Sequence, residues 1–234
     1  MNLLQLVQQA CREMAQPVPN AVATATDEQS SQLFGLAIAL GQELAELDHD
    51  WQRLIALHTF ATDGTGSASL PSDFLRPING TWWDRTQDWK LREGVLPQGW
   101  RWLNESSLAN AAPIASLRIA GNAINYYPTT NTGNTFVFDY ISANWAIDGD
   151  TGDGKSAFTK DTDTCKFRDR LMINGIKLKF FEAKGFDTLI QERDFARSLE
   201  SAMSEQGAPS LSISGQHLGT RLLDYGNVPD SGMG

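Results

Sequence analysis

The sequence has few cysteines and histidines and lacks any long apolar run. Among its 234 residues are 2 cysteines and 3 histidines. Cys11 and Cys165 form no C-x-x-C pair, which argues against a zinc or redox motif, and both fall within apolar helical patterns typical of buried, reduced thiols. No segment approaches the ~18 uncharged apolar residues of a membrane span, and no signal-peptide pattern is present. We therefore expect a soluble protein made in the cytoplasm, with no membrane contact.

Basic residues are outnumbered by acidic ones. The chain has 19 Lys and Arg against 28 Asp and Glu, which gives a formal net charge of −9. Tight nucleic-acid binding depends largely on Lys and Arg that displace counterions from phosphates. The composition therefore argues against a protein that holds DNA tightly, although an acidic surface by itself identifies no partner.

No catalytic signature stands out. His49, His58 and His217 lie far apart in the sequence, without an H-x-x-x-H pair or a carboxylate at ligand spacing. A G-x-S-x-G turn is absent, and neither cysteine has the local signature of a nucleophile. Folding brings together the paired carboxylates of a glycoside hydrolase, so sequence spacing neither selects nor removes such a pair. We expect no catalytic residue, no cofactor and no metal, and keep a hydrolase as an alternative.

Apolar residues at helical spacing open the chain. They predict a first helix from Leu3 to Met14, which Pro17 stops. Capping-box spacing over 26–29 then precedes an apolar stripe that predicts a second helix through Leu47.

Helical spacing returns only near residue 164. It predicts a third helix with Asp163 or Thr164 as its cap and Gly185 as its left-handed end. A second capping-box match at 188–191 opens a fourth helix that runs to Gly207.

The middle of the chain is rich in β-branched and aromatic residues broken by Gly, Pro and Asp. Within it, "LPQGWRWL" predicts a short helix that begins near Pro97. Two alternating runs flank Gly121-Asn122 and a third follows, so we expect a three-stranded antiparallel meander from about Ala115 to Trp145.

These elements predict an α+β protein. We expect a four-helix bundle of two N-terminal and two C-terminal helices, with an inserted antiparallel β domain and an extended C-terminal tail. The tail has few large apolar residues, so we expect it to be disordered or loosely held when alone. The predicted units are the N-terminal helices (1–53), the β domain (54–147), an acidic loop (148–163), the C-terminal helices (164–206) and a flexible arm (207–234).

The segment from Gly149 to Ser156 spells G-x-x-x-x-G-K-S, the pattern of a phosphate-binding loop. Such a loop follows a buried parallel strand and opens directly into a helix. Here the preceding strand belongs to an antiparallel meander, and "AFTKDTDT" after Ser156 has no helical stripe. Nearby aspartates would also repel a triphosphate. Nucleotide binding through Lys155 and Ser156 is therefore the least favoured function.

The same aspartates do not form a calcium loop. Asp148 and Asp150 lie two apart, but the glycine position of an EF-hand holds Asp153 and its last position holds Thr159 instead of glutamate. We interpret 148–163 as a solvated loop that leads into the third helix.

Several phrases resemble head-to-tail adaptor proteins of tailed bacteriophages. They are "HDWQRLIALHTF" from His49, "LPSDFLRPINGTWWDRT" from Leu70, "LPQGWRWL" from Leu96 and "FVFDYISANWAI" from Phe136, and with the order of elements the resemblance covers about residues 1–205. It implies a helical bundle carrying a β domain. It also implies a structural protein of the head-tail neck of the virion, assembled as a ring of twelve copies between the portal protein and a tail tube or nozzle protein. The ring would extend the channel for double-stranded DNA and help to retain the genome, with no sequence-specific contact.

Ring subunits join through two different, complementary surfaces, which favour aromatic anchors. Trp82 and Trp83 point to opposite faces if they share a strand, so one can enter a core while the other meets solvent or a partner. In relatives the C-terminal segment reaches along the portal. The expected interface residues are Trp82, Trp83, Arg85, Leu211, Ile213, Leu218, Leu222, Leu223 and Tyr225. The first alternative to this adaptor is a tail-associated peptidoglycan hydrolase.

Overall fold

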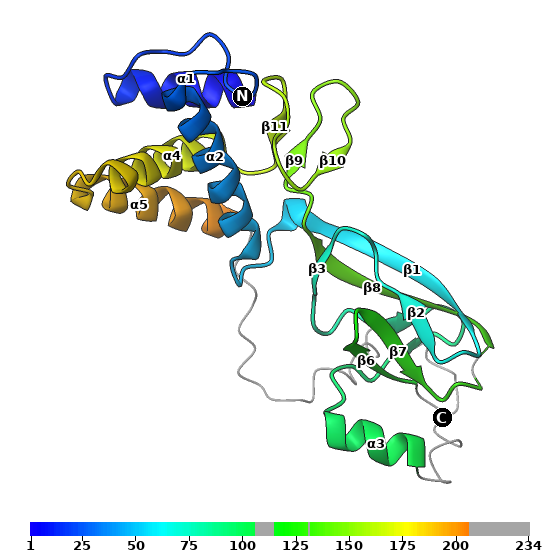
Figure 1. The fold of residues 1–234 in the computed structure, drawn as a ribbon. Coiled ribbons are helices and arrows are strands. Elements are labelled where there is room, and N and C mark those ends of the chain that lie inside the picture. The colour runs from blue at the N-terminus through cyan, green and yellow to red at the C-terminus, as the bar shows by residue number, and fades with distance from the viewer. Residues whose placement is uncertain (106–114, 131, 206–234) are drawn as a thin grey trace, which may run out of the picture.

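The computed structural model describes residues 1–105, 115–130 and 132–205. It has a part made of helices and a part made mainly of antiparallel strands, which confirms the α+β class (Figure 1). The helices of the helical part come from the N-terminal and C-terminal thirds of the chain, whereas the main sheets come from its middle. One hydrophobic core lies among the helices and a second lies between the sheets.

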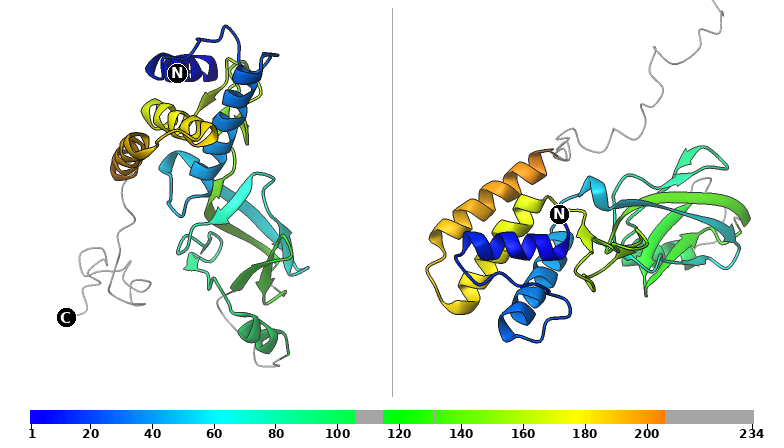
Figure 2. Two further views of the ribbon diagram at one scale, coloured as in Figure 1. Left: turned by 60° about the vertical axis from the view of Figure 1, so that its left-hand side comes forward. Right: turned by 90° about the horizontal axis from the view of Figure 1, so that it is seen from above.

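Four helices form the helical part. They are α1 (Leu3–Glu13), α2 (Glu28–Glu46), α4 (Asp169–Lys184) and α5 (Leu189–Glu205). Helix α4 contacts each of the other three, and Figure 2 shows it between α1 and α5. Its central position explains why six consecutive residues, 171–176, are buried in a helix that amphipathic spacing alone would leave half exposed.

The helix starts differ in detail from the predicted ones. The cap of α2 is Asp27, whose carboxylate accepts the Ser30 N–H at 2.9 Å, one residue after the predicted Thr26. The third predicted helix, α4, begins at Asp169 and not near residue 164, because Thr164 and Cys165 pair as a strand instead. Its predicted end at Gly185 is confirmed, with a left-handed φ of 69°.

Glycine allows the helical core to pack closely. A Cβ atom added at Gly41 would overlap the Trp145 ring, and one added at Gly175 would overlap the Leu40 side chain. Both glycines lie inside helices, where glycine costs about 1 kcal/mol relative to alanine. The close approach of α2 to Trp145 and of α4 to α2 is the structural gain that offsets this cost.

The β part consists of two antiparallel sheets that pack face to face. After the short 3-10 helix η1 (Gln52–Leu54), one sheet has the order β1-β8-β4-β5, and β3 also pairs with β8. The other sheet has the order β2-β7-β6. The strands are β1 (Ile55–Asp63), β2 (Ser67–Ser69), β3 (Phe74–Pro77), β4 (Trp83–Asp84), β5 (Trp89–Lys90), β6 (Ser116–Ala120), β7 (Ala123–Tyr127) and β8 (Thr132–Ser142).

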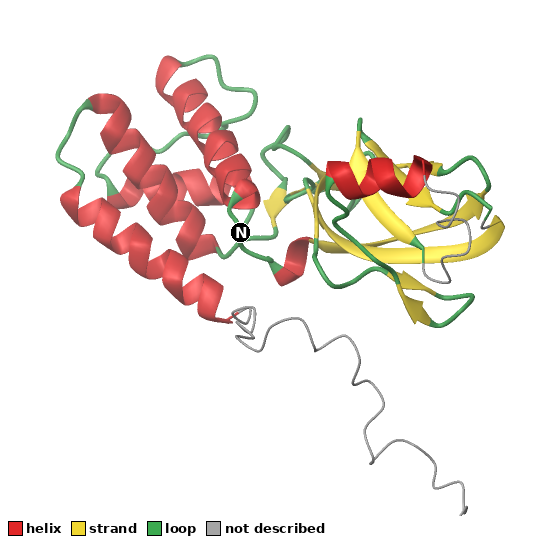
Figure 3. Cartoon of the chain, turned by 90° about the horizontal axis from the view of Figure 1, so that it is seen from below, coloured by secondary structure: helices red, strands yellow, loops and turns green. Residues whose placement is uncertain are grey.

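The predicted meander is only half right. Strands β6 and β7 form the expected hairpin about Gly121-Asn122, but β8 does not pair with β7. The free edge of β7 is taken by β2, and β8 finds a longer partner in β1. The short helix predicted near Pro97 is present as α3 (Pro97–Glu105), which is the red helix drawn over the strands in Figure 3; Figure 1 shows it at the end of the β part away from the other helices.

Aromatic rings fill the core between the sheets. Phe138 is fully buried at its centre and stacks on Trp82 with ring centroids 3.8 Å apart. Phe136 meets the edges of Phe60 and Tyr126, which come from opposite sheets. The β part is therefore a small sandwich held together by rings.

A third small sheet follows β8 and joins the two parts. Strand β9 (Ala146–Ile147) lies between β10 (Gly154–Lys155) and β11 (Thr164–Cys165). Cys165 is thus on a strand and not in a helix, and burial raises the pKa of its thiol to about 11. None of the helices in the described ranges has both the length and the apolar character needed to cross a membrane.

Candidate interaction surfaces

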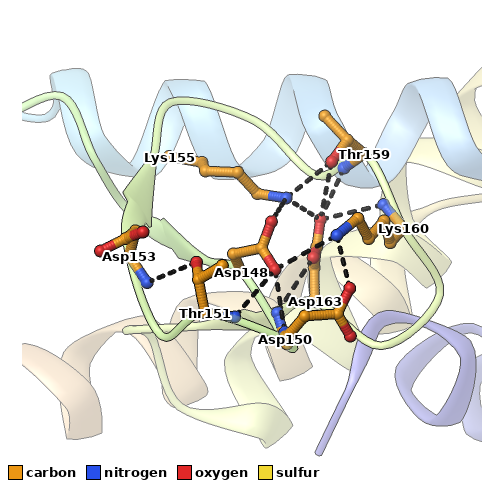
Figure 4. Close-up of polar contacts among 9 residues, drawn as sticks. Asp148, Asp150, Thr151, Asp153, Lys155, Thr159, Lys160 and Asp163 are labelled. Carbon is orange, nitrogen blue, oxygen red and sulfur yellow. Dashed lines mark hydrogen bonds and ion pairs between the residues drawn. The ribbon is translucent and has the colours of Figure 1, made fainter.

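The segment 148–163 is exposed over most of its length, but several of its charged side chains form a compact cluster that the sequence did not predict. Lys155 Nζ lies 2.8 Å from a carboxylate oxygen of Asp148 and 2.9 Å from one of Asp163 (Figure 4). Asp163 is fully buried, and its carboxylate also accepts the backbone N–H groups of Thr159 and Lys160 at 2.7 and 2.9 Å. Buried charges are tolerated when they are paired and hydrogen-bonded in this way.

The cluster keeps its acids ionised. Burial acts to raise the pKa of Asp163, but hydrogen bonds from Thr159 and Lys155 outweigh burial and lower this pKa to about 2. For Asp148, hydrogen bonding to Lys155 is the largest effect and holds the pKa well below its ordinary value. Asp148 and Asp163 are therefore both ionised at neutral pH.

This cluster fastens the start of the chain. The Leu3 N–H donates to the Asp163 carbonyl oxygen at 2.7 Å, at the first turn of α1. The Asp161 carboxylate accepts the N–H groups of Val22 and Ala23, between α1 and α2, at 3.0 and 2.8 Å. The segment thus serves as a structural staple between the N-terminal helices and β9.

The geometry also explains why the phosphate-loop pattern is misleading. Lys155 belongs to the two-residue strand β10, and the next helix begins only at Asp169. The Lys155 ammonium group already contacts two carboxylates. The lysine of a nucleotide-binding loop instead points toward the phosphates of the ligand. The segment therefore has neither the helix nor the free cation that phosphate binding requires.

The predicted interface residues lie in different environments. Trp82 is buried inside its own subunit at 3% exposure, whereas Trp83 is half-buried and Arg85 is exposed. Strand β4 pairs Trp83 with Val137, which places both on the outer face of the main sheet. The six predicted residues of the C-terminal arm, Leu211, Ile213, Leu218, Leu222, Leu223 and Tyr225, lie outside the described residues.

A pocket of about 290 Å³ opens beside the start of α3. Its walls are mainly apolar, with Trp82, Val95 and Leu117 among the lining residues. Leu96 lies at its rim and is 75% exposed. We call this site the Glu93 pocket, because Glu93 also lines it.

A second exposed apolar site lies where α4 turns into α5. Phe186, Leu189 and Ile190 are 53%, 72% and 59% exposed there. Further along α5, the opposite side of the helix packs Phe195 and Leu199 against the helical core. We call the exposed side of α5, with Leu189, Ile190 and Arg193, the α5 outer face.

The sequence contained a signal for only one of these sites. Leu189 and Ile190 do not fall on the stripe of Phe195, Leu199 and Ala202, so helical periodicity alone places them on the exposed side. The Glu93 pocket has no such signal, because its walls come from β6 and from loops near residues 77 and 95.

Phe186, Leu189 and Ile190 are exposed together, and a contiguous exposed apolar patch is typical of a surface that binds another protein. Consistent with such a surface, the family model for the SU10 adaptor protein matches residues 1–213. The chain therefore belongs to the SU10 adaptor protein family, a family of phage head-to-tail adaptors. This membership confirms the predicted resemblance and assigns the protein a structural adaptor role in the phage particle. No curated protein matches the chain.

Proposed function

We propose that the protein forms a ring beneath the portal protein of the filled head, where it extends the DNA channel and receives the tail. Membership of the adaptor family is the observation that carries this proposal. The separate exposed apolar sites support it, because a ring subunit must contact neighbouring copies and also the components above and below. The resemblance implies twelve copies.

The charge of the chain suits a channel through which DNA moves. A net charge of −9 supplies few cations to hold phosphates, so packaged double-stranded DNA would pass without sequence-specific binding. Retention of the genome would then depend on closing the channel with the next tail component, and not on affinity for DNA.

The C-terminal arm, residues 207–234, is proposed to contact the portal. Deletion of the arm should leave the isolated subunit folded, with an unchanged melting temperature, but prevent its attachment to heads. Sedimentation of purified heads mixed with full-length or shortened protein measures attachment directly. A large fall in the melting temperature of the shortened subunit would instead show that the arm packs on its own chain.

Electron microscopy of particles tests the central proposal. Wild-type particles should show one ring of this protein between portal and tail. Particles made without the protein should be tailless heads that have lost DNA. Absence of the protein from purified, infectious particles would overturn the proposal.

The proposed role makes and breaks no covalent bond. Incubation of the purified protein with peptidoglycan should therefore release no sugar or peptide fragment, with a known muramidase as the positive control. Released fragments would favour the tail-associated hydrolase instead.

A further inference from the structure

The Glu93 pocket contains an unsatisfied buried acceptor. One carboxylate oxygen of Glu93 accepts the Gly80 N–H at 2.5 Å, but the other is buried without a hydrogen-bond partner. Buried polar atoms almost always have partners, and an unpaired carboxylate oxygen is among the more costly exceptions. Because this oxygen is buried, the pocket wall carries an uncompensated negative charge, which favours a positively charged group in the pocket.

The walls indicate which kind of positively charged group fits the pocket. Val95 and Leu117 provide apolar surface next to the carboxylate, and exposed Leu96 extends that surface at the rim. A basic side chain combines an aliphatic stem, which packs on apolar walls, with a charged end that donates to a carboxylate. The same pocket is lined by Arg118, so a complementary partner also presents an acid beside its basic group.

The α5 outer face has this combination. Arg193 and Asp194 are neighbours whose side chains lie 3.7 Å apart and are 58% and 37% exposed. Ile190 lies one turn before Arg193, on the side of the helix opposite the partly buried Phe195. Exposed apolar surface thus adjoins a weakly engaged pair of opposite charges.

These two sites cannot meet within one chain. The α5 helix starts at the outer corner of the helical part, whereas the Glu93 pocket lies beside α3 at the other end of the molecule (Figure 1). Two different, complementary surfaces on one chain join copies head to tail, and such contacts close into a ring when the rotation allows.

We propose that the α5 outer face of one copy occupies the Glu93 pocket of the next copy. The guanidinium of Arg193 then lies in the pocket opposite the negative charge of Glu93, Asp194 pairs with Arg118, and Ile190 packs on Leu96. The inference deepens the proposed function, since it rests on ring formation and identifies the two surfaces that form the ring.

Cysteine cross-linking in assembled particles tests this contact. The variant Ile190→Cys with Leu96→Cys should give, on oxidation of purified particles, a ladder of covalent oligomers on non-reducing gels. Each single-cysteine variant and the pair Ile190→Cys with Leu57→Cys are matched controls. Leu57 is also exposed, at 55%, but it lies on β1 and does not line the pocket, so these controls should give no ladder.

Charge reversal provides an independent test. Glu93→Lys and Arg193→Glu should each reduce the yield of infectious particles by at least about tenfold, because like charges then face each other. Combining both changes in one chain should restore the yield, since every contact again pairs opposite charges. Arg12→Glu, an equal charge change on exposed α1 surface, should have little effect. Melting curves of the purified variants establish that each is folded. If Glu93→Lys is not, Glu93→Gln replaces it as a single variant that should also reduce the yield, and the cysteine cross-link then tests which two surfaces meet.

The outcomes separate this inference from the proposed function. A ring in particles without a cross-linked ladder, or a double reversal no better than the single ones, would overturn the contact but leave the ring intact. Absence of the protein from particles would overturn the proposed function itself.

Discussion

The two parts of the molecule are stabilised in different ways. In the helical part, helices from both ends of the chain approach closely where glycine replaces a larger residue, as at Gly41 and Gly175. In the β part, a continuous segment is held by aromatic rings stacked between two sheets. We therefore expect larger side chains to reduce stability most in the helical core, and smaller side chains to reduce it most in the β core.

Ion pairs are also distributed unevenly between the two parts, and most of them lie in the helical part. The two ends of the chain are joined by Met1 to Asp169, by Glu13 to Arg170 and Lys177, and by Glu43 to Lys179. No ion pair joins two residues within the described ranges of the β part, 55–105, 115–130 and 132–142. Arg76 of this part does form an ion pair, but its partner is Asp50, just after α2. Changes of charge should therefore affect the helical part more.

Removing the central ring of the β core should have the largest effect. Phe138→Ala leaves a cavity beneath Trp82 and should lower the free energy of unfolding by about 4 kcal/mol. Urea denaturation followed by tryptophan fluorescence measures the loss. Leu57→Ala, on the exposed face of the neighbouring strand, is the control and should change stability little. A loss below about 1 kcal/mol for Phe138→Ala would show that the sheets do not depend on this ring.

Breaking the buried charge cluster should rank second. Asp163→Asn leaves Lys155 with one carboxylate and weakens the hold on α1, so unfolding should cost about 3 kcal/mol less. Asp153→Asn is the matched control, because Asp153 is exposed and makes no ion pair among those of the described chain. Hydrogen exchange should show the amides of Leu3 and Leu4 losing protection only in Asp163→Asn. Equal protection in both variants would contradict the assigned staple.

The contrast between the parts also explains what the sequence predicted well. The helices and the β6-β7 hairpin depend on local patterns, which are stripes at helical spacing and the turn at Gly121-Asn122. The pairing of β8 with β1 joins residues such as Ile55 and Ile141, and local alternation contains no information about that partner.

The charge cluster of 148–163 and the Glu93 pocket were harder to predict, because both depend on residues far apart in the sequence that bury one another. Five aspartates between 148 and 163 indicated a solvated loop, and nothing in their spacing distinguishes Asp163, which is buried, from exposed Asp153. The Glu93 pocket requires β6 to lie beside residues 93–97. Only the α5 outer face follows from periodicity.

Added atoms in the helical core should have an intermediate effect. Gly41→Ala places a methyl group against the Trp145 ring, so despite the better helix propensity we expect a net loss of about 2 kcal/mol. Gly35→Ala, in the same helix, meets open space and should stabilise the protein by up to about 1 kcal/mol. Chemical denaturation of the two variants measures this difference in sign. Stabilisation by both would show that α2 and Trp145 are not in close contact.

The smallest effect should come from a surface ion pair that joins α1 to α4. Burial acts to raise the pKa of Glu13, but hydrogen bonds from Lys177 and its neighbours outweigh it and lower the pKa to about 2. The charged form therefore stabilises the fold above the ordinary pKa of 4.5, and this contribution is lost as pH falls toward 2. Glu13→Gln should cost less than about 1 kcal/mol at pH 7. Urea titrations at pH 7, 4.5 and 3 should show the wild type and the variant converging as pH falls, whereas a constant difference would assign the role of Glu13 to packing.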